Sequence, residues 1–141
     1  MRGDYCHNEI LVRSLRQVAE ECGATVRVEV AVRIDGVVNY IDVVIEKDGR
    51  RFIAEPEQES RRVGNDVRKA VAIGAELLLI ATPDAPTAQA CRRQLRRHPL
   101  PSSKLTVIAC PLGAAREILR QTLNADYIQT LPIGPTRRKA T

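Results

Sequence analysis

Three extended segments joined by two Asp-Gly turns constrain the fold of this chain more than any other feature. Over 24–34, valine and isoleucine alternate with polar residues, which is the period of two of a half-buried strand. The Asp-Gly dipeptides at 35–36 and 48–49 favour tight hairpin turns. They predict an antiparallel meander of the first segment with 37–46 and 50–57. The middle segment is apolar on both faces at most positions, so we expect it to be covered on both sides.

Helical patterns surround this meander. Apolar residues recur at a spacing of three to four over 5–22 and again over 60–74, which predicts one helix before the meander and one after it. The rest of the chain alternates in the same way, with short apolar strands at 76–82 and 105–109 and helices at 87–97 and 111–123. A strand bounded by helices normally lies parallel to its neighbour. The sequence therefore predicts an α/β fold with an αβββαβ core, in which helices flank both faces of a mixed sheet.

The length of 141 residues allows one domain with one core. We expect this domain to span 1–129 and to be followed by a basic tail over 130–141 that has nothing to pack against and is mobile. No apolar run approaches the ~18 to 20 residues that cross a bilayer, and the N-terminus lacks the apolar stretch of a signal peptide. We therefore expect a soluble, cytoplasmic protein with no membrane partner.

Composition narrows the classes of ligand. The four cysteines form no C-x-x-C pair and the two histidines lie far apart, which argues against a zinc site of ordinary spacing and for reduced, mostly buried thiols. The formal net charge of +5 favours polyanionic partners, although a basic surface alone does not define a function.

Acidic residues interrupt the strands that otherwise look like core. Asp42 breaks the apolar run of the middle strand, and Glu55 and Glu57 lie two apart on the third strand and so share a face. If the hairpin pairs Glu46 with Arg51, Asp42 falls opposite the neighbourhood of Glu55. Carboxylates so close repel unless a cation lies among them, and hard cations such as Mg²⁺ and Mn²⁺ prefer oxygen ligands. The pattern predicts a metal site; the alternative is that these acids are solvated and pair with nearby arginines.

These acids also carry a family resemblance. Asp42, a spacer of twelve residues and then Glu55-Pro56-Glu57, placed on the second and third strands of this core, resemble the motif of the PD-(D/E)xK nuclease superfamily, which includes restriction endonucleases and Holliday-junction resolvases. The opening helix, led by Glu9, is similar to the glutamate-led first helix of the resolvase-like members. Most of the support for this resemblance comes from the order of the helices and strands. The resemblance covers a little over half of the chain.

The resemblance implies a restriction-endonuclease-like fold and a Mg²⁺- or Mn²⁺-dependent endonuclease that acts on DNA. It makes Asp42 and Glu55 metal ligands, and it places Glu57, as catalytic residue and further ligand, where most of the family has lysine. Glu9 would assist the metal or its water, or would face solvent. Lys69 on the next helix could replace the missing lysine, although the sequence alone favours a solvated helix residue.

Basic residues are predicted to hold the nucleic-acid backbone through phosphate contacts. They flank the acids or form a face of the helix at 87–97, and they are Arg61, Arg62, Arg68, Arg92, Arg93, Arg96 and Arg97. Because only 3% of the residues are aromatic, stacking platforms are scarce, which favours duplex or branched DNA over single-stranded RNA and leaves RNA open.

Three functions compete at this point. The first is a DNA nuclease, which as a homodimer would cut both strands. The second is a catalytically degenerate module of the same fold that binds nucleic acid or a protein partner, which the missing lysine favours. The third is an unrelated mixed-sheet domain that binds a small ligand or a subunit, in which buried acids would have no evident purpose.

Overall fold

The computed structural model describes residues 2–97 and 104–125, with side chains from residue 9 onward. The predicted tail over 130–141 lies outside this part of the chain. The elements follow one another as α1 (Arg2–Glu21), β1 (Thr25–Ile34), β2 (Val37–Lys47), β3 (Arg50–Pro56), the 3₁₀ turn η1 (Ser60–Arg62), α2 (Val63–Ala72), β4 (Leu77–Thr82), α3 (Ala85–Arg96), β5 (Thr106–Pro111) and α4 (Leu112–Asn124).

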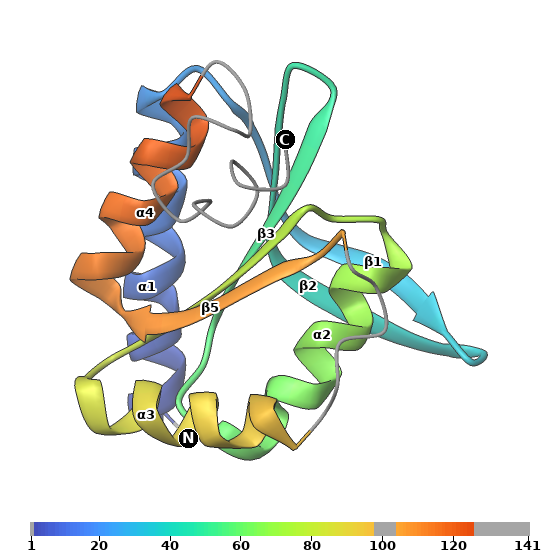
Figure 1. The fold of residues 1–141 in the computed structure, drawn as a ribbon, viewed down its shortest axis with the longest axis vertical. Helices are drawn as coiled ribbons and strands as arrows, with labels where there is room; N and C mark the ends of the chain where they lie inside the picture. The colour runs from blue at the N-terminus through green and yellow to red at the C-terminus, as the bar shows by residue number, and fades with distance from the viewer. Residues whose placement is uncertain (1, 98–103, 126–141) are drawn as a thin grey trace, which may run out of the picture.

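The five strands form one mixed sheet in the order β1-β2-β3-β4-β5 (Figure 1). The first three pair antiparallel, and β4 and β5 join in parallel through helical crossovers. Both predicted turns have positive φ at both residues, 51° and 79° at Asp35 and Gly36 and 53° and 77° at Asp48 and Gly49, as a type I′ hairpin requires. The predicted αβββαβ order and mixed sheet are confirmed.

Helices cover both faces of the sheet (Figure 1). Leu15 of α1 and Leu119 of α4 pack with Leu79 on one face. On the other face, Val67 of α2 packs with Leu78, and α3 lies on the same side. Leu78 and Leu79 are neighbours in β4 and point in opposite directions, and every residue of this strand is buried. The short apolar strand at the centre of the sheet therefore supplies both halves of the core.

The first half of β2 departs from the prediction that this strand is covered on both sides. Val37, Val38 and Tyr40 are 62%, 43% and 60% exposed, whereas Ile41 and Val43 are buried. This half pairs with β1 alone, and together they form a hairpin arm that projects from the body of the sheet (Figure 1). The prediction was wrong here because α2 contacts the arm from one side only, at Asn39 and Asp35, whereas the side that carries Val38 and Tyr40 stays exposed.

The strand changes phase where the arm joins the sheet. Ile41 packs in the core on the α2 side, whereas Val43, two residues further, packs on the α1 side. Residues two apart in a regular strand lie on the same face. The β1–β2 ladder lacks a pair at Asp42, and Glu29, opposite it by register, has a φ of 52°. Asp42 therefore lies at an irregular point of the sheet.

Two further features of the described residues bear on the sequence expectations. None of their helices is long and apolar enough to span a membrane. Cys22, Cys91 and Cys110 are free thiols, and the last two are buried.

Candidate functional site

A polar pocket lies where β2 and β3 separate, which we call the fork. Strand pairing ends at Val43 and Ala54. One residue further, the backbone N–H of Asp42 donates to Oε1 of the Glu55 side chain, at 3.2 Å. The Glu55 side chain thus accepts the hydrogen bond that a backbone carbonyl would accept if the pairing of β2 and β3 continued. The pocket at this point has a volume of about 380 Å³ and receives residues from β2, the end of β3 and α2.

The three predicted carboxylates meet in this pocket. Asp42, Glu55 and Glu57 all line it, so the two hairpin strands do deliver their acids to one place. Glu55 and Glu57 are only 1% and 7% exposed. Glu57 follows the last residue of β3 and is held by its backbone N–H, which donates to the carbonyl of Ala81 at 2.8 Å. Solvated acids, the alternative raised by the sequence, do not describe these two glutamates.

Lys69 of α2 is part of the same cluster. Its Nζ lies 2.8 Å from Oε2 of Glu55 and 3.6 Å from Oδ1 of Asp66. It also donates to the backbone carbonyl of Tyr40 at 2.8 Å. The expectation of a solvated helix residue is wrong, because the face of α2 that carries Lys69 and the buried Val67 packs against the sheet. An ammonium group therefore reaches the strand-three acid from the following helix.

Asp66 is a member of the cluster that the sequence reasoning missed. It is 3% exposed and lies one helical turn before Lys69. A signal was present, because Asp66 follows Val63 by three positions and precedes Ala70 by four, and so shares the apolar face of the helix. The strand acids were identified because they interrupt an apolar pattern, and the same criterion applied to this helix identifies Asp66.

One buried oxygen in the pocket, Oδ2 of Asp66, accepts no hydrogen bond from any described group. Oε2 of Glu55, by contrast, lies 2.8 Å from Nζ of Lys69, which neutralises it. Buried carboxylate oxygens are normally satisfied, since leaving one without a partner costs about 1 to 3 kcal/mol or more. The pocket therefore has capacity for a further positively charged or hydrogen-bonding ligand.

The chemistry of these donors suits a hard cation that keeps part of its water shell. Mg²⁺ is usually held by one or two carboxylates, with water and substrate phosphates as the remaining ligands. Among the described residues, no three acidic, histidine or cysteine side chains form a complete metal-binding group. Asp42 and Glu55 nevertheless both line the pocket, and the backbone N–H of Asp42 holds the Glu55 carboxylate at the fork. The residues present fit an open site and do not form an enclosed one.

The electrostatics of the cluster favour retention of a proton. Burial raises the pKa of Glu55 to about 8; Lys69 opposes this shift and Asp42 adds to it. Burial, a hydrogen bond with Glu57 and the charge of Glu55 raise the pKa of Asp66 well above its ordinary value. Burial would lower the pKa of Lys69, but its acidic neighbours outweigh this effect and raise it. Lys69 therefore stays charged at neutral pH, while the carboxyl groups hold a proton that a bound cation would displace.

Glu9 is not brought to the fork. It lies on the exposed side of α1, 3.9 Å from Arg13, and it does not line the pocket. The buried stripe of this helix consists of Leu11, Leu15 and the residues that follow at helical spacing, and Glu9 lies away from it. The sequence left open whether Glu9 assists a metal or faces solvent. In the structure it faces solvent, so a role in the site is not supported.

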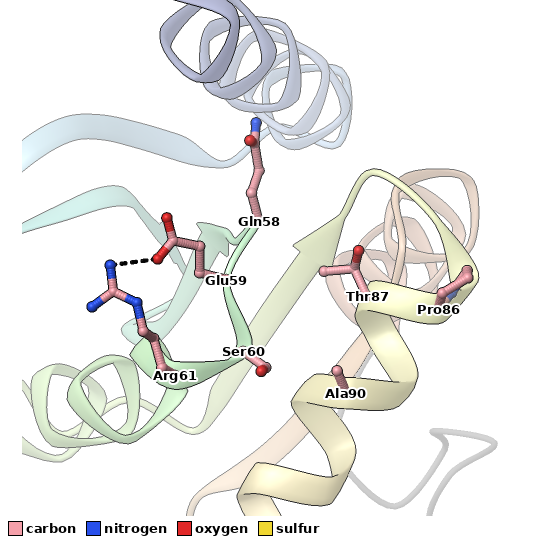
Figure 2. Close-up of a pocket in the computed structure, with 7 residues that line it drawn as sticks. All are labelled: Gln58, Glu59, Ser60, Arg61, Pro86, Thr87 and Ala90. Carbon is pink, nitrogen blue, oxygen red and sulfur yellow. Dashed lines mark ion pairs between the residues drawn. The ribbon is translucent and has the colours of Figure 1, made fainter. Parts of the chain in front are cut away.

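The predicted arginines of the first group differ in position. Arg62 lines the acidic pocket. Arg68 is exposed and pairs with Asp35 at the tip of the hairpin arm, at 2.8 Å. Arg61 pairs with Glu59 at 2.6 Å. Figure 2 shows this pair at the rim of a second hollow, of about 460 Å³, between residues 58–61 and the start of α3, with Arg61 directed away from the helix.

The four arginines of α3 and its end form a separate surface. Nε of Arg92 donates to the carbonyl of Ala109 at 2.9 Å, which anchors the helix to β5. Arg93, Arg96 and Arg97 are exposed, and none of the four lines the acidic pocket. Phosphate binding by this surface stays a prediction.

Comparison with known proteins leaves the family open. Neither a family model nor a curated protein matches the chain. Among solved structures, the chain is similar to one described as "Protein of Unknown Function AF1548", with a TM-score of 0.48 and 17% sequence identity over 69% of this chain. The match covers 56% of that protein, so this chain spans a little over half of its length.

Proposed function

We propose that this chain is a metal-dependent nuclease that hydrolyses phosphodiester bonds in DNA, with its active site at the fork. The observation that carries the proposal is the buried pair of Glu55 and Lys69, with Nζ 2.8 Å from Oε2, beside Asp42. The PD-(D/E)xK resemblance calls for two carboxylates and a lysine, and strand three lacks the lysine. Lys69 supplies it in space from α2. The proposal explains why four acids and a lysine line one pocket at the edge of the core.

Each residue of the cluster has a role in this proposal. Asp42 and Glu55 would hold Mg²⁺ or Mn²⁺, which when bound lowers the pKa of a coordinated water and polarises the scissile phosphate. Lys69 would orient the attacking water, since the carbonyl of Tyr40 and the carboxylate of Asp66 fix its ammonium group. Glu57, as neighbour of Asp66, would receive or relay the proton.

Charge supports a polyanionic substrate. Arg62 lines the pocket itself and would contact a phosphate next to the scissile one. The exposed arginines of α3 would hold a more distant part of the backbone, and the formal net charge is +5. A homodimer would place two such sites on opposite strands of a duplex, and this remains part of the proposal.

A second candidate is a module of the same fold that binds DNA or a protein without cutting. It is favoured by one specific contact: Lys69 already neutralises Oε2 of Glu55, the oxygen that a cation would use. In this alternative the ammonium group of Lys69 permanently takes the place of the metal.

One experiment separates the two candidates. The protein is incubated with supercoiled, linear and four-way-junction DNA in Mg²⁺ or Mn²⁺, and parallel samples are run on native gels. A nuclease cuts at least one substrate, and Asp42→Asn or Glu55→Gln abolishes cutting while Glu117→Gln, at an exposed acid on α4, does not. A binding module retards DNA with or without metal, more weakly as salt increases, and leaves it intact.

A further inference from the structure

The second hollow, between residues 58–61 and the start of α3, shares a wall with the acidic pocket; we call it the α3 hollow. The wall is the segment 57–62. Its two ends, Glu57 and Arg62, line the acidic pocket, and its middle, residues 58–61, lines the α3 hollow. A polymer that lies over the acidic pocket and continues across this segment therefore meets the α3 hollow next.

The lining of the α3 hollow is small and polar. Ser60 lies on one side, and Thr87 and Ala90 of α3 lie on the other. Figure 2 shows the Ser60 hydroxyl directed toward α3. The acid at the rim, Glu59, is paired with Arg61 at 2.6 Å, so its charge is neutralised. Because serine and threonine hydroxyls donate hydrogen bonds to phosphate oxygens, the lining suits an anionic chain.

The side of α3 that borders the hollow continues into cations. At about 100° per residue, Arg97, seven residues after Ala90, lies within about 20° of the same side of the helix, and Arg93 lies within about 60° of it. Both arginines are exposed, and no acidic residue occurs over 85–97. The distance from Ala90 to Arg97 along the helix is about 10 Å, which corresponds to about three base steps of a duplex.

The other two arginines of this region lie on different sides of the helix. Arg96 is about 120° around the helix from Ala90, and Arg92 is about 160° around. Nε of Arg92 donates to the carbonyl of Ala109 in β5, away from the hollow. The start of the helix is already capped by the side chain of Asp84, so the surface in question is the side of α3 and not its N-terminus.

We propose that the α3 hollow, together with Arg93 and Arg97, binds the sugar-phosphate backbone of a DNA duplex on one side of the scissile phosphate, and that Arg92 and Arg96 do not contact it. The inference rests on the proposed nuclease function for the position of the scissile phosphate, but the backbone contact itself needs no metal. The four arginines thus divide into two that bind DNA and two that do not.

Metal-free binding tests the division of the arginines independently of cleavage. The affinity of the full chain for a short fluorescein-labelled duplex is measured by anisotropy in EDTA over a series of KCl concentrations. Each phosphate contact contributes about 0.9 to the slope of log affinity against log salt. We expect the double variant Arg93→Gln/Arg97→Gln to bind more weakly and to lower that slope by about two. Arg96→Gln, which removes an adjacent exposed cation, is the matched control and should retain the slope.

Ala90→Glu tests the hollow itself. The substitution adds a carboxylate to its lining and should weaken duplex binding about tenfold, because the carboxylate repels the phosphates. Ala114→Glu adds the same charge at an exposed alanine of α4, on the other face of the sheet, and should bind as wild type does. Thermal unfolding of each variant provides equal concentrations of folded protein for the comparison.

Several outcomes would overturn the inference. They are an unchanged salt slope in the double variant, equal losses of affinity in Arg96→Gln and Arg97→Gln, and wild-type affinity in Ala90→Glu. A chain that binds poly-glutamate and not the duplex assigns this surface to an acidic protein partner and also contradicts the inference. A protein that binds the duplex as expected and cuts no DNA in Mg²⁺ contradicts the nuclease proposal alone.

Discussion

Lys69 of α2 and Glu55 of β3 form a buried ion pair that joins a helix to the sheet at the fork. Their side chains are 10% and 1% exposed, and the carbonyl of Tyr40 is the third partner. The pair places an ammonium group beside the acid that, in the proposed mechanism, also holds the metal. Its consequences for stability, titration and metal binding can each be measured.

Replacement of Lys69 separates structure from chemistry. Lys69→Met leaves Glu55 and Asp66 buried without their cation, so we expect a loss of about 3 kcal/mol in the free energy of unfolding, reduced where the acids take up protons. Lys69→Arg keeps the charge and should retain most of this stability. Cleavage should fall by about 10²- to 10⁴-fold in Lys69→Met, because the attacking water is no longer oriented. Urea unfolding and single-turnover cleavage measure the two effects.

Arg68→Met is the control for that variant. It removes a neighbouring cation whose side chain is 53% exposed and pairs only across the surface with Asp35. Equal destabilisation by both substitutions would contradict the special position of Lys69.

The stability of the metal-free protein should fall as pH rises. Burial raises the pKa of Glu55 from its ordinary 4.5 to about 8, and that of Asp66 is raised as well. Between these values the folded protein retains a proton that the unfolded chain releases. The stabilisation is complete below about pH 4.5 and is lost as pH rises through about 8. Thermal unfolding in EDTA should give a melting temperature that decreases over this window, and Glu55→Gln should flatten the profile. A rising profile would contradict the assignment.

Metal binding should release protons. A cation at Asp42 and Glu55 requires the ionised form of Glu55, so affinity for Mn²⁺ should increase with pH until about 8 and then level off. Calorimetric titration of Mn²⁺ at pH 7 in two buffers with different enthalpies of ionisation measures the number of protons released. We expect Asp42→Asn to weaken binding strongly. Identical heats in the two buffers would mean that no proton leaves the site.

The irregular point of β1 opposite Asp42 can be tested by substitution. Glu29 is exposed and has a φ of 52°, a conformation that glycine adopts without strain and β-branched residues adopt poorly. Glu29→Gly should therefore leave stability unchanged or increase it slightly, and Glu29→Val should cost about 1 to 2 kcal/mol. Chemical denaturation of both variants measures this. If the valine variant is as stable as the glycine variant, the strand is regular there and the phase change at Asp42 needs another cause.

Much of the β2–β3 hairpin was predictable because its turn fixes the register. The two-residue turn predicted Glu46 opposite Arg51, which is the observed pair, and counting along the strands then brings Asp42 to Glu55. The order of the elements and the parallel β4 followed in the same way from local pattern.

Contacts between elements were harder to predict from the sequence. The position of Lys69 depends on how α2 packs on the sheet, and the helical pattern alone does not specify that angle. The exposure of Tyr40 depends on which side of the arm the helices cover, which an apolar strand pattern does not encode. Asp66 could have been predicted from its place on the apolar face of the helix. It was missed because buried acids were sought only in strands.

The central claim is that Asp42 and Glu55 at the fork cleave DNA with a divalent cation. The most direct test is the single-turnover rate of cleavage of an end-labelled branched DNA in Mg²⁺, compared between wild type, Asp42→Asn and Glu117→Gln at equal concentrations of folded protein. The account predicts cleavage that Glu117→Gln retains and that Asp42→Asn and EDTA both abolish. DNA that stays intact with wild-type protein in Mg²⁺ and in Mn²⁺, or cleavage that survives Asp42→Asn, would contradict it.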